Sequence, residues 1–397
     1  MRVLQVNYTT MQFEPPIFAL GKLLGSLQHE VVCLGYHTAG LPSTEVVSPN
    51  YTIHRFPRRE FCSLPRLIRG GLRLLQFWRD IYQFGRQFKP HCVISYSYET
   101  LPAALRIPRA GDLVYYCAEY SPGPCSRDYA IGWGFLKLLE PTCVRHCDHV
   151  ISVEPDRAKL QEAQWRRRVD HVILNAPDFD PDIETRALAA VRSRSGHARF
   201  VMAGTISKRA CVEPLIESAL LCESVSLDLY GRLEPSYADH FNQLIQSLPT
   251  IAGRRIRYHG PVPYHQLGTA LLEYDVGICA YDDCSPNTAL ASPAKLFEYM
   301  RSGLAVVATA QPTPSRVVTT SCCGFVVPPT TLDGLPAIMR RLDRNHSELI
   351  TLRANALRAF REKFAFSAQA GPLVSEIVKG PRTQPCRILS SEADLRA

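Results

Sequence analysis

The chain has 397 residues, of which 46% are hydrophobic and 21% charged. This composition is that of a globular protein, and the length exceeds that at which one hydrophobic core keeps growing, so we expect two domains. No apolar run approaches the roughly 20 residues of a membrane-spanning helix, and the opening MRVLQVNYTT lacks a signal-peptide pattern, so we expect a cytoplasmic protein.

The 14 cysteines are scattered through apolar segments without a CxxC pair, which predicts reduced, mostly buried thiols. The nearest approach to a metal cluster is CVRHC at residues 143–147, which has no second ligand pair, so we predict no metal. The net charge of +8 is compatible with nucleic-acid binding, but no zinc-finger, RNP-like or helix-turn-helix pattern accompanies it. We therefore predict no nucleic-acid partner.

The first half of the chain alternates short apolar runs with amphipathic stretches. The expected strands are RVLQVNY, HEVVCLGY, HCVISYSY, LVYYCAEY and HVISVEP, with a helix at FALGKLLGSLQ and a long helical stretch that ends near residue 88. Short apolar runs separated by helical patterns predict parallel strands joined by crossover helices, which is a doubly wound α/β sheet.

The second half repeats this pattern after a connector rich in Pro and Asp, near residue 180. Its expected strands are FVMAG, VSLDLYG, IRYHG, VGICAY, AVVAT and GFVVPP. We therefore predict two Rossmann-like domains, at residues 1–180 and 181–380, and a disordered tail at residues 381–397. A helix around residues 347–378 is expected to begin on the second domain and return toward the first.

Two such domains would place the carboxyl ends of their strands across an interdomain cleft, where open α/β sheets bind ligands. The GxGxxG fingerprint of a dinucleotide cofactor is absent after the first strand, where the sequence reads TTMQFEPP. This absence disfavours an oxidoreductase.

The stretch SPAKLFEYM at residues 292–300 predicts a helix with a ligand at its start. Ser292 is expected as the N-cap and Pro293 as the first helical residue. Amides at a helix start favour phosphate, and Lys295 adds a positive charge. Glu298, one turn further on, can accept hydrogen bonds from a ribose diol, so the pattern indicates a nucleotide. Spacing alone leaves open a solvated ion pair between Lys295 and Glu298.

The same segment carries a family resemblance. The run IRYHGPVPYHQLGTALLEYDVGICAY and the later SPAKLFEYMRSGLAVVAT resemble the donor half of a GT-B glycosyltransferase of family 4, in a variant with a Pro-x-Lys-x-x-Glu-Tyr helix. FVMAGTISKR and LYG resemble its phosphate loop and next strand, which places Gly204 and Gly231 beside the nucleotide. The resemblance implies two domains facing a cleft and transfer of a hexose-like sugar, with retention, from a nucleotide-sugar donor to a glycan or lipid-linked acceptor. It also implies no divalent metal and no other cofactor.

Carried over by position, Glu298 resembles the family's ribose-binding glutamate, and the turn at 292–295 resembles the backbone beside the donor diphosphate. The glutamate that family members commonly have shortly before this helix is Leu290 here. We expect Asn287 and Ser292 to supply its hydrogen bonds to the donor sugar.

The phosphate loop also departs from the family pattern. Gly204 is followed by Thr205 in place of an arginine, and Lys208 and Arg209 are the nearest substitutes. Departure of the nucleotide leaves negative charge on its phosphate, so fixed cations such as Lys208, Arg209 and Lys295 would stabilise the transition state. A solvated pair in a loop is the alternative for Lys208 and Arg209.

On the acceptor side, YYCAEYSPG resembles the family's loop containing a glutamate, so Glu119 is expected to orient or deprotonate the acceptor hydroxyl. Tyr96, Tyr98 and Tyr120 flank the same strand ends and can stack on a sugar, although tyrosines at sheet edges are common. Asp282 and Asp283 are a faint echo of the DxD cluster of metal-dependent transferases, and we interpret them as a solvated loop.

Residues 55–89 are rich in arginine and contain few acidic residues. The helical part is expected to gather Leu64, Leu67, Ile68, Leu74, Leu75, Trp78, Ile81 and Tyr82 near one face, with Arg66, Arg69, Arg73 and Arg86 largely off it. One interpretation is that this stretch lies on an anionic membrane surface, at the inner face of the membrane, where a lipid-linked acceptor is found. The other is that the apolar face packs on the first sheet and the arginines are solvated.

Two other functions remain open at this point. A nucleotide-sugar epimerase can have a similar double-Rossmann shape, and would convert the donor alone. A non-catalytic glycosyltransferase-like subunit would bind nucleotide without turnover, as the departures at Leu290 and Thr205 allow.

Overall fold

The computed structural model describes residues 1–11, 15–58, 65–118, 120, 131–193 and 196–380. The chain divides into two compact units, the first comprising Met1–Leu174 and the segment from Gln369 onward, and the second Asn175–Ala368. The boundaries expected from the sequence are residues 180 and 380. The second boundary differs because the last helix enters the first unit at Gln369. The tail expected to be disordered, 381–397, lies outside the described residues.

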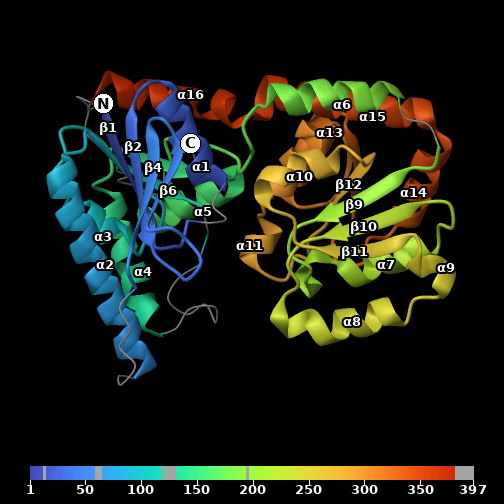
Figure 1. Ribbon diagram of the computed structural model, residues 1–397, viewed down its shortest axis with the longest axis horizontal. Coiled ribbons are helices and arrows are strands. Elements are labelled where there is room, and N and C mark those ends of the chain that lie inside the picture. The colour runs from blue at the N-terminus through green and yellow to red at the C-terminus, as the bar shows by residue number, and fades with distance from the viewer. Residues whose placement is uncertain (12–14, 59–64, 119, 121–130, 194–195, 381–397) are drawn as a thin grey trace. The chain divides into compact units, whose positions relative to one another are not determined.

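The first unit contains an eight-stranded sheet with the order β3-β4-β2-β1-β5-β6-β7-β8. Figure 1 shows this sheet, with β1, β2, β4 and β6 labelled. Its strands are β1 (Arg2–Val6), β2 (Glu30–Tyr36), β3 (Thr44–Ser48), β4 (Tyr51–Phe56), β5 (Cys92–Ser95), β6 (Leu113–Cys117), β7 (His149–Ser152) and β8 (His171–Val172). All pairings are parallel except that of β3 with β4. The hairpin β3–β4 is not among the expected strands, because β3 is a partly exposed edge without the apolar run that marks a buried strand.

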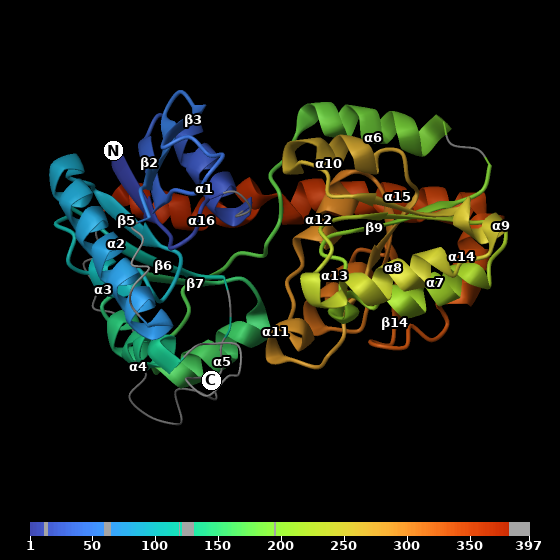
Figure 2. The ribbon, with the colours of Figure 1, turned by 60° about the horizontal axis from the view of Figure 1, so that its bottom comes forward.

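Helices cover both faces of this sheet. They are α1 (Pro15–Ser26), α2 (Arg66–Phe88), α3 (Leu101–Ala104), α4 (Ile131–Val144), α5 (Pro155–Trp165) and most of α16 (Phe366–Lys379). Phe77 and Ile81 of α2 join one core with Leu113, Tyr115 and Val150 of the sheet. Helix α16 lies on the opposite face, as Figures 1 and 2 show.

The second unit contains a six-stranded, fully parallel sheet with the order β11-β10-β9-β12-β13-β14. Its strands are β9 (Arg199–Ala203), β10 (Ser226–Tyr230), β11 (Ile256–Gly260), β12 (Val276–Cys279), β13 (Ala305–Thr309) and β14 (Gly324–Val327). Each corresponds to one of the expected apolar runs. The prediction of two doubly wound α/β sheets is therefore confirmed.

The helices of the second unit are α6 (Pro181–Ser193), α7 (Val212–Leu220), α8 (Ala238–Gln246), α9 (Thr250–Gly253), α10 (Tyr264–Leu271), α11 (Pro286–Ala289), α12 (Ala294–Arg301), α13 (Pro312–Thr320), α14 (Leu335–Arg344) and α15 (His346–Ala359), with short 3-10 turns η1 (Lys208–Ala210) and η2 (Pro235–Tyr237). Helices α6, α10, α12 and α15 pack together on one face, and α7 and α14 pack on the other (Figure 2). A helix expected around 347–378 is interrupted: a π-helical turn, Phe360–Phe364, separates α15 from α16.

Not all arginines of the basic stretch, residues 55–89, lie on the surface. Arg55 lies in β4 and is buried, where it donates to the carbonyl oxygens of Thr10, Met11 and Pro42 and pairs with Glu45. It is a structural residue and adds no charge to the surface. Among the described residues, no helix is long and apolar enough to cross a membrane.

Candidate functional site

Two glycines lie where β9 and β10 end, at the carboxyl edge of the second sheet. Gly204 and Gly231 have φ angles of 134° and 143°, which residues with a side chain rarely adopt. A Cβ on Gly231 would lie 1.6 Å from the carbonyl oxygen of Gly204, so the two backbones approach too closely for any side chain. Gly204 and the following Thr205 are exposed. No side chain at these two positions covers the backbone, so a ligand can contact the backbone at the carboxyl ends of β9 and β10.

Lys295 reaches this edge from the first turn of α12. A Cβ on Gly204 would lie 3.8 Å from its Cδ, and its Nζ donates to the carbonyl oxygen of Ala280 at 3.3 Å. The same Nζ lies 4.1 Å from the ring centroid of Tyr281. Lys295 is only 8% exposed, and no carboxylate of the described residues forms an ion pair with it. Buried cations are normally paired with an anion, so the positive charge of Lys295 favours the binding of an anionic ligand here.

Glu298 lies one turn later on α12 and is 1% exposed. Its Oε1 accepts a hydrogen bond from the hydroxyl of Tyr264 at 2.7 Å, and its Oε2 pairs with Arg301 at 2.6 Å. Burial raises the pKa of this carboxyl, although Arg301 and Tyr264 act in the opposite direction. The alternative of a solvated Lys295–Glu298 pair is wrong, because both side chains are buried and each has different partners.

The start of α12 differs from the expectation. Helix α12 begins at Ala294, its N-cap is Pro293, and no side chain caps it. The predicted N-cap, Ser292, is buried and contacts Asn175 instead: its Oγ accepts from the backbone N–H of Asn175 at 3.3 Å, and its carbonyl oxygen accepts from Nδ2 at 3.1 Å. The hydroxyl of Ser292 therefore contacts Asn175 and does not cap α12.

The other predicted donor-side residues lie on nearby loops of the same unit. Lys208 and Arg209 are exposed in η1, and the carbonyl oxygen of Arg209 accepts from the N–H of Asp282 at 2.9 Å. Asp282 is buried, so its interpretation as part of a solvated loop is wrong, whereas Asp283 is exposed. Asn287 is half-buried on α11.

Sequence reasoning missed the residues that hold this site in place. Besides Tyr264, Arg301 and Tyr281, these include Tyr299, which is fully buried. Its hydroxyl accepts from the N–H of Ala203 at 2.8 Å and donates to the carbonyl oxygen of Ile278 at 3.2 Å. A Cβ on Gly277 would lie 2.3 Å from the ring of Tyr299, so the absence of a side chain there admits the ring. In the sequence, the only hint of this contact is a glycine within the apolar run of β12 followed by a tyrosine in α12.

The first unit has a cavity of about 210 Å³ at the carboxyl ends of β1, β5 and β6. It is lined by Asn7, Tyr8, Thr9, Pro16, Ile17, Tyr96, Ser97, Tyr98, Glu99, Tyr115, Cys117, Ala118 and Lys137. Two of the tyrosines expected to stack on a sugar, Tyr96 and Tyr98, therefore share one cavity. Glu119 itself lies outside the described residues, although the adjacent Ala118 lines this cavity.

A buried polar group forms one wall of the cavity. Lys137 is 6% exposed, lies 5.1 Å from the ring centroid of Tyr98 and forms an ion pair with Glu140. Glu140 also accepts a hydrogen bond from the hydroxyl of Tyr115 at 2.6 Å. The cavity thus combines aromatic surface with fixed polar groups, the combination that sugar-binding sites use.

Comparisons with known proteins support the fold. No family model matches the chain, and no curated protein does. Among solved structures, the sucrose-phosphate synthase of Thermosynechococcus elongatus matches 96% of this chain and 99% of its own, with a TM-score of 0.72 at 16% identity. HepE from Anabaena, solved in complex with UDP-glucose, matches 96% of this chain and 100% of its own, with a TM-score of 0.68 at 14% identity.

A third solved structure belongs to a plant enzyme. The catalytic domain of starch synthase IV from Arabidopsis thaliana, bound to ADP and acarbose, matches 95% of this chain and 98% of its own, with a TM-score of 0.66 at 11% identity. These identities are low, so the likeness concerns the fold. The chain therefore has the GT-B fold class, with two Rossmann-like doubly wound domains.

Proposed function

We propose that this chain is a metal-independent glycosyltransferase that moves a hexose-like sugar, with retention of configuration, from a nucleotide-sugar donor to a glycan or lipid-linked acceptor. The observation that carries the proposal is Lys295: its side chain is 8% exposed, it forms no ion pair with a carboxylate of the described residues, and its aliphatic stem passes the glycine Gly204 at the carboxyl end of β9. A diphosphate would supply the missing negative charge. The GT-B fold class, shared with proteins solved with UDP-glucose and ADP, is consistent with such a ligand.

The roles follow from the chemistry of the leaving group. Negative charge develops on the donor phosphate as its bond to the sugar breaks, so Lys295, with Lys208 and Arg209 on the exposed loop, would stabilise the transition state. Glu298 would accept hydrogen bonds from the ribose hydroxyls, and Asn287 would contact the donor sugar. Ser292 would contact the donor sugar by donating its hydroxyl hydrogen, because its Oγ already accepts a hydrogen bond from the N–H of Asn175.

On the acceptor side we assign the cavity of the first unit to the acceptor and Glu119 to the acceptor hydroxyl. Tyr96 and Tyr98 offer ring surface to a sugar, and the buried pair of Lys137 and Glu140 fixes one wall.

The decisive experiment is a thermal-shift screen of the full chain against UDP, GDP, ADP, dTDP and their sugars, without added metal. A ligand at a hundred times its dissociation constant should stabilise the protein by roughly 2.7 kcal/mol. The best nucleotide sugar is then incubated with a panel of glycan and lipid-linked acceptors. Transfer of sugar with release of nucleotide supports the proposal.

The same assay separates the two alternatives. Conversion of the donor alone into an isomer, without nucleotide release, would indicate an epimerase. Nucleotide binding without turnover across the whole panel would indicate a binding subunit. Absence of any nucleotide binding would contradict all three.

For a lipid-linked acceptor we propose that α2 approaches an anionic membrane surface. The structure divides the residues expected on one apolar face: Leu74 and Ile81 are buried, whereas Ile68 and Leu75 are 52% and 56% exposed. Positions 68, 75, 79 and 86 follow one another along a single stripe of an α-helix, so the exposed Ile68 and Leu75 are followed on the same stripe by the exposed Arg79 and Arg86. An exposed stripe of this composition can lie on anionic lipid.

Liposome co-sedimentation tests this part of the proposal. Replacing Arg79 and Arg86 by Gln should reduce binding to anionic vesicles at low salt, since each basic residue near the surface contributes about 1 kcal/mol. A control with Arg254 and Arg344 of the second unit changed to Gln removes the same charge and should bind like the wild type. Equal binding by all three proteins, or none, would favour a soluble glycan acceptor.

A further inference from the structure

A second cluster of polar side chains lies in the first unit, at the amino ends of β6, β7 and β8, whereas the cavity lies at the carboxyl ends of the strands. Three of its members come from neighbouring positions on the sheet: Asp112 precedes β6, His149 begins β7 and His171 begins β8. In the parallel register Val114 pairs with His149 and Ile151 pairs with His171. Residues two apart along a strand share a face, so all three side chains project from the same face.

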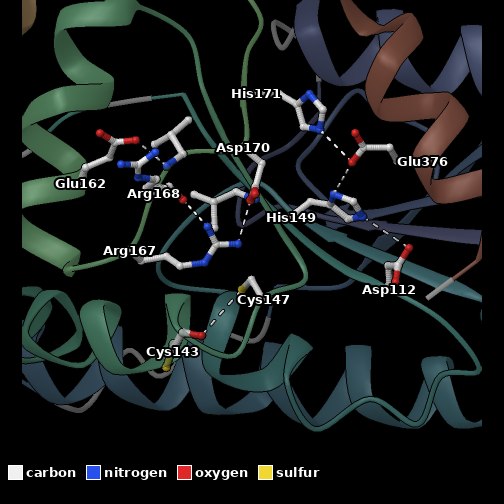
Figure 3. Close-up of polar contacts among 12 residues, drawn as sticks. Asp112, Cys143, Cys147, His149, Glu162, Arg167, Arg168, Asp170, His171 and Glu376 are labelled. Atoms are coloured by element: carbon white, nitrogen blue, oxygen red, sulfur yellow. Dashed lines mark hydrogen bonds and ion pairs between the residues drawn. The ribbon is translucent and has the colours of Figure 1, made fainter. Parts of the chain in front are cut away.

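Glu376 of α16 completes this cluster from above that face (Figure 3). Its Oε2 lies 3.3 Å from Nδ1 of His149 and 3.3 Å from Nε2 of His171. These three ligand atoms all lie within 4.8 Å of one another. Ligands of a tetrahedral zinc ion, each about 2.0–2.1 Å from the metal, stand roughly 3.3–3.4 Å apart. Both distances to Glu376 fit that spacing.

His149 is the residue that requires an explanation. Its side chain has no exposed surface, and neither ring nitrogen makes a hydrogen bond of acceptable geometry. Nδ1 nevertheless faces Glu376, and Nε2 lies 3.5 Å from Oδ2 of Asp112. Both carboxylate oxygens of Asp112 are likewise buried without a hydrogen-bond partner. Two carboxylates that face one buried imidazole require a nearby positive charge, which a metal ion bound by the imidazole would supply.

We propose that His149, His171 and Glu376 form a zinc site that fastens α16 to the first sheet. Two imidazoles and one carboxylate are ligands that suit Zn²⁺, and hard cations such as Mg²⁺ and Ca²⁺ prefer oxygen ligands alone. Metal-binding histidines usually donate their other N–H to a carboxylate, which is the position of Asp112 relative to Nε2 of His149. Because the side chain of Glu376 is 37% exposed, water can supply the fourth ligand.

This site differs from the one that the sequence suggested and dismissed. Cys143 and Cys147 of CVRHC do not belong to the cluster, and the thiol of Cys147 contacts the carbonyl oxygen of Cys143 instead (Figure 3). The ligands were not visible in the sequence because Glu376 is far from the histidines along the chain. The site is also independent of the proposed sugar transfer, since its role is to hold α16.

The test uses the full chain, stripped with a chelator and titrated with Zn²⁺ in competition with a chromophoric chelator. We expect one equivalent to bind, and Zn²⁺ to raise the melting temperature. His171→Ala and Glu376→Gln should each weaken binding at least about tenfold, and Asp112→Asn should weaken it about 10- to 100-fold. His146→Ala, which removes an exposed histidine nearby, is the matched control and should change nothing.

Co²⁺ provides a second readout that does not depend on stability. Its absorption spectrum should show nitrogen and oxygen ligation, without a thiolate charge-transfer band. A thiolate band that disappears in Cys143→Ser would overturn the assignment of the ligands. Zn²⁺ binding to the wild type that is no tighter than to the His171→Ala, Glu376→Gln double variant would overturn the site itself.

Discussion

Glu298 combines deep burial with a proposed role that needs its charged form. Burial raises the pKa of its carboxyl, so it takes up a proton at a higher pH than an exposed glutamate. Only the carboxylate can accept hydrogen bonds from both ribose hydroxyls while Tyr264 and Arg301 occupy its other lone pairs. Affinity for the nucleotide sugar should therefore fall as the pH is lowered from about 7 to 5.

Calorimetry with a nucleotide sugar measures this effect, because its diphosphate has no group that titrates in that range. In Glu298→Gln the affinity should be weaker at pH 7 by about 1.5–3 kcal/mol and should change little with pH. An equally steep pH dependence in the wild type and in Glu298→Gln would show that another group is responsible.

Lys295 allows binding and stability to be separated. Lys295→Met keeps the length of the side chain but removes a buried charge that no carboxylate of the described residues balances. We expect nucleotide affinity to fall by about 1.5–3 kcal/mol, roughly 10- to 150-fold. The melting temperature without ligand should stay the same or rise, because an uncompensated buried charge is lost. Lys159→Met, which removes an exposed lysine of the first unit, is the control and should alter neither quantity.

Helix α12 is held to its sheet by the hydroxyl of Tyr299. Tyr299→Phe leaves the buried N–H of Ala203 without this acceptor, so we expect a loss of about 1–3 kcal/mol in the free energy of unfolding. Tyr237→Phe is a matched control in the same unit, because the hydroxyl of Tyr237 is buried without a hydrogen-bond partner. Denaturant unfolding of both variants measures the difference. Equal losses would show that the hydrogen bonds of Tyr299 contribute nothing specific.

The elements also show how far sequence patterns reach. The buried strands were predictable because a parallel strand covered on both faces must be a short apolar run. The hairpin β3–β4 was missed because it is a partly exposed edge. The sequence predicts that Lys295 and Glu298 lie one turn apart on a helix, as they do on α12, but it does not show their partners. Tyr264 and Tyr281 lie on other elements, and only the folded chain brings them to α12. The start of α12 was misplaced for the same reason, since Asn175 holds Ser292 from a distant segment.

Each of the two units has a hydrophobic core of its own. One core gathers residues of the first sheet with Phe77, Ile81 and Trp165, and the other gathers residues of the second sheet with Leu215 and Met339. The chain passes between the units at Leu174–Asn175 and at Ala368–Gln369. We therefore expect calorimetry to resolve two unfolding transitions, of which a bound nucleotide raises only that of the second unit.

Two glycine substitutions assign the transitions independently of any ligand. A Cβ on Gly21 would lie 2.4 Å from the buried ring of Tyr51 in the first unit, and one on Gly277 would lie 2.3 Å from the ring of Tyr299 in the second. Overpacking of this kind costs about 1–3 kcal/mol, so Gly21→Ala should lower one transition and Gly277→Ala the other. The nucleotide should stabilise the transition that Gly277→Ala lowers. If both variants shifted a single transition by similar amounts, the two cores would unfold as one cooperative unit, and the nucleotide would stabilise the molecule as a whole.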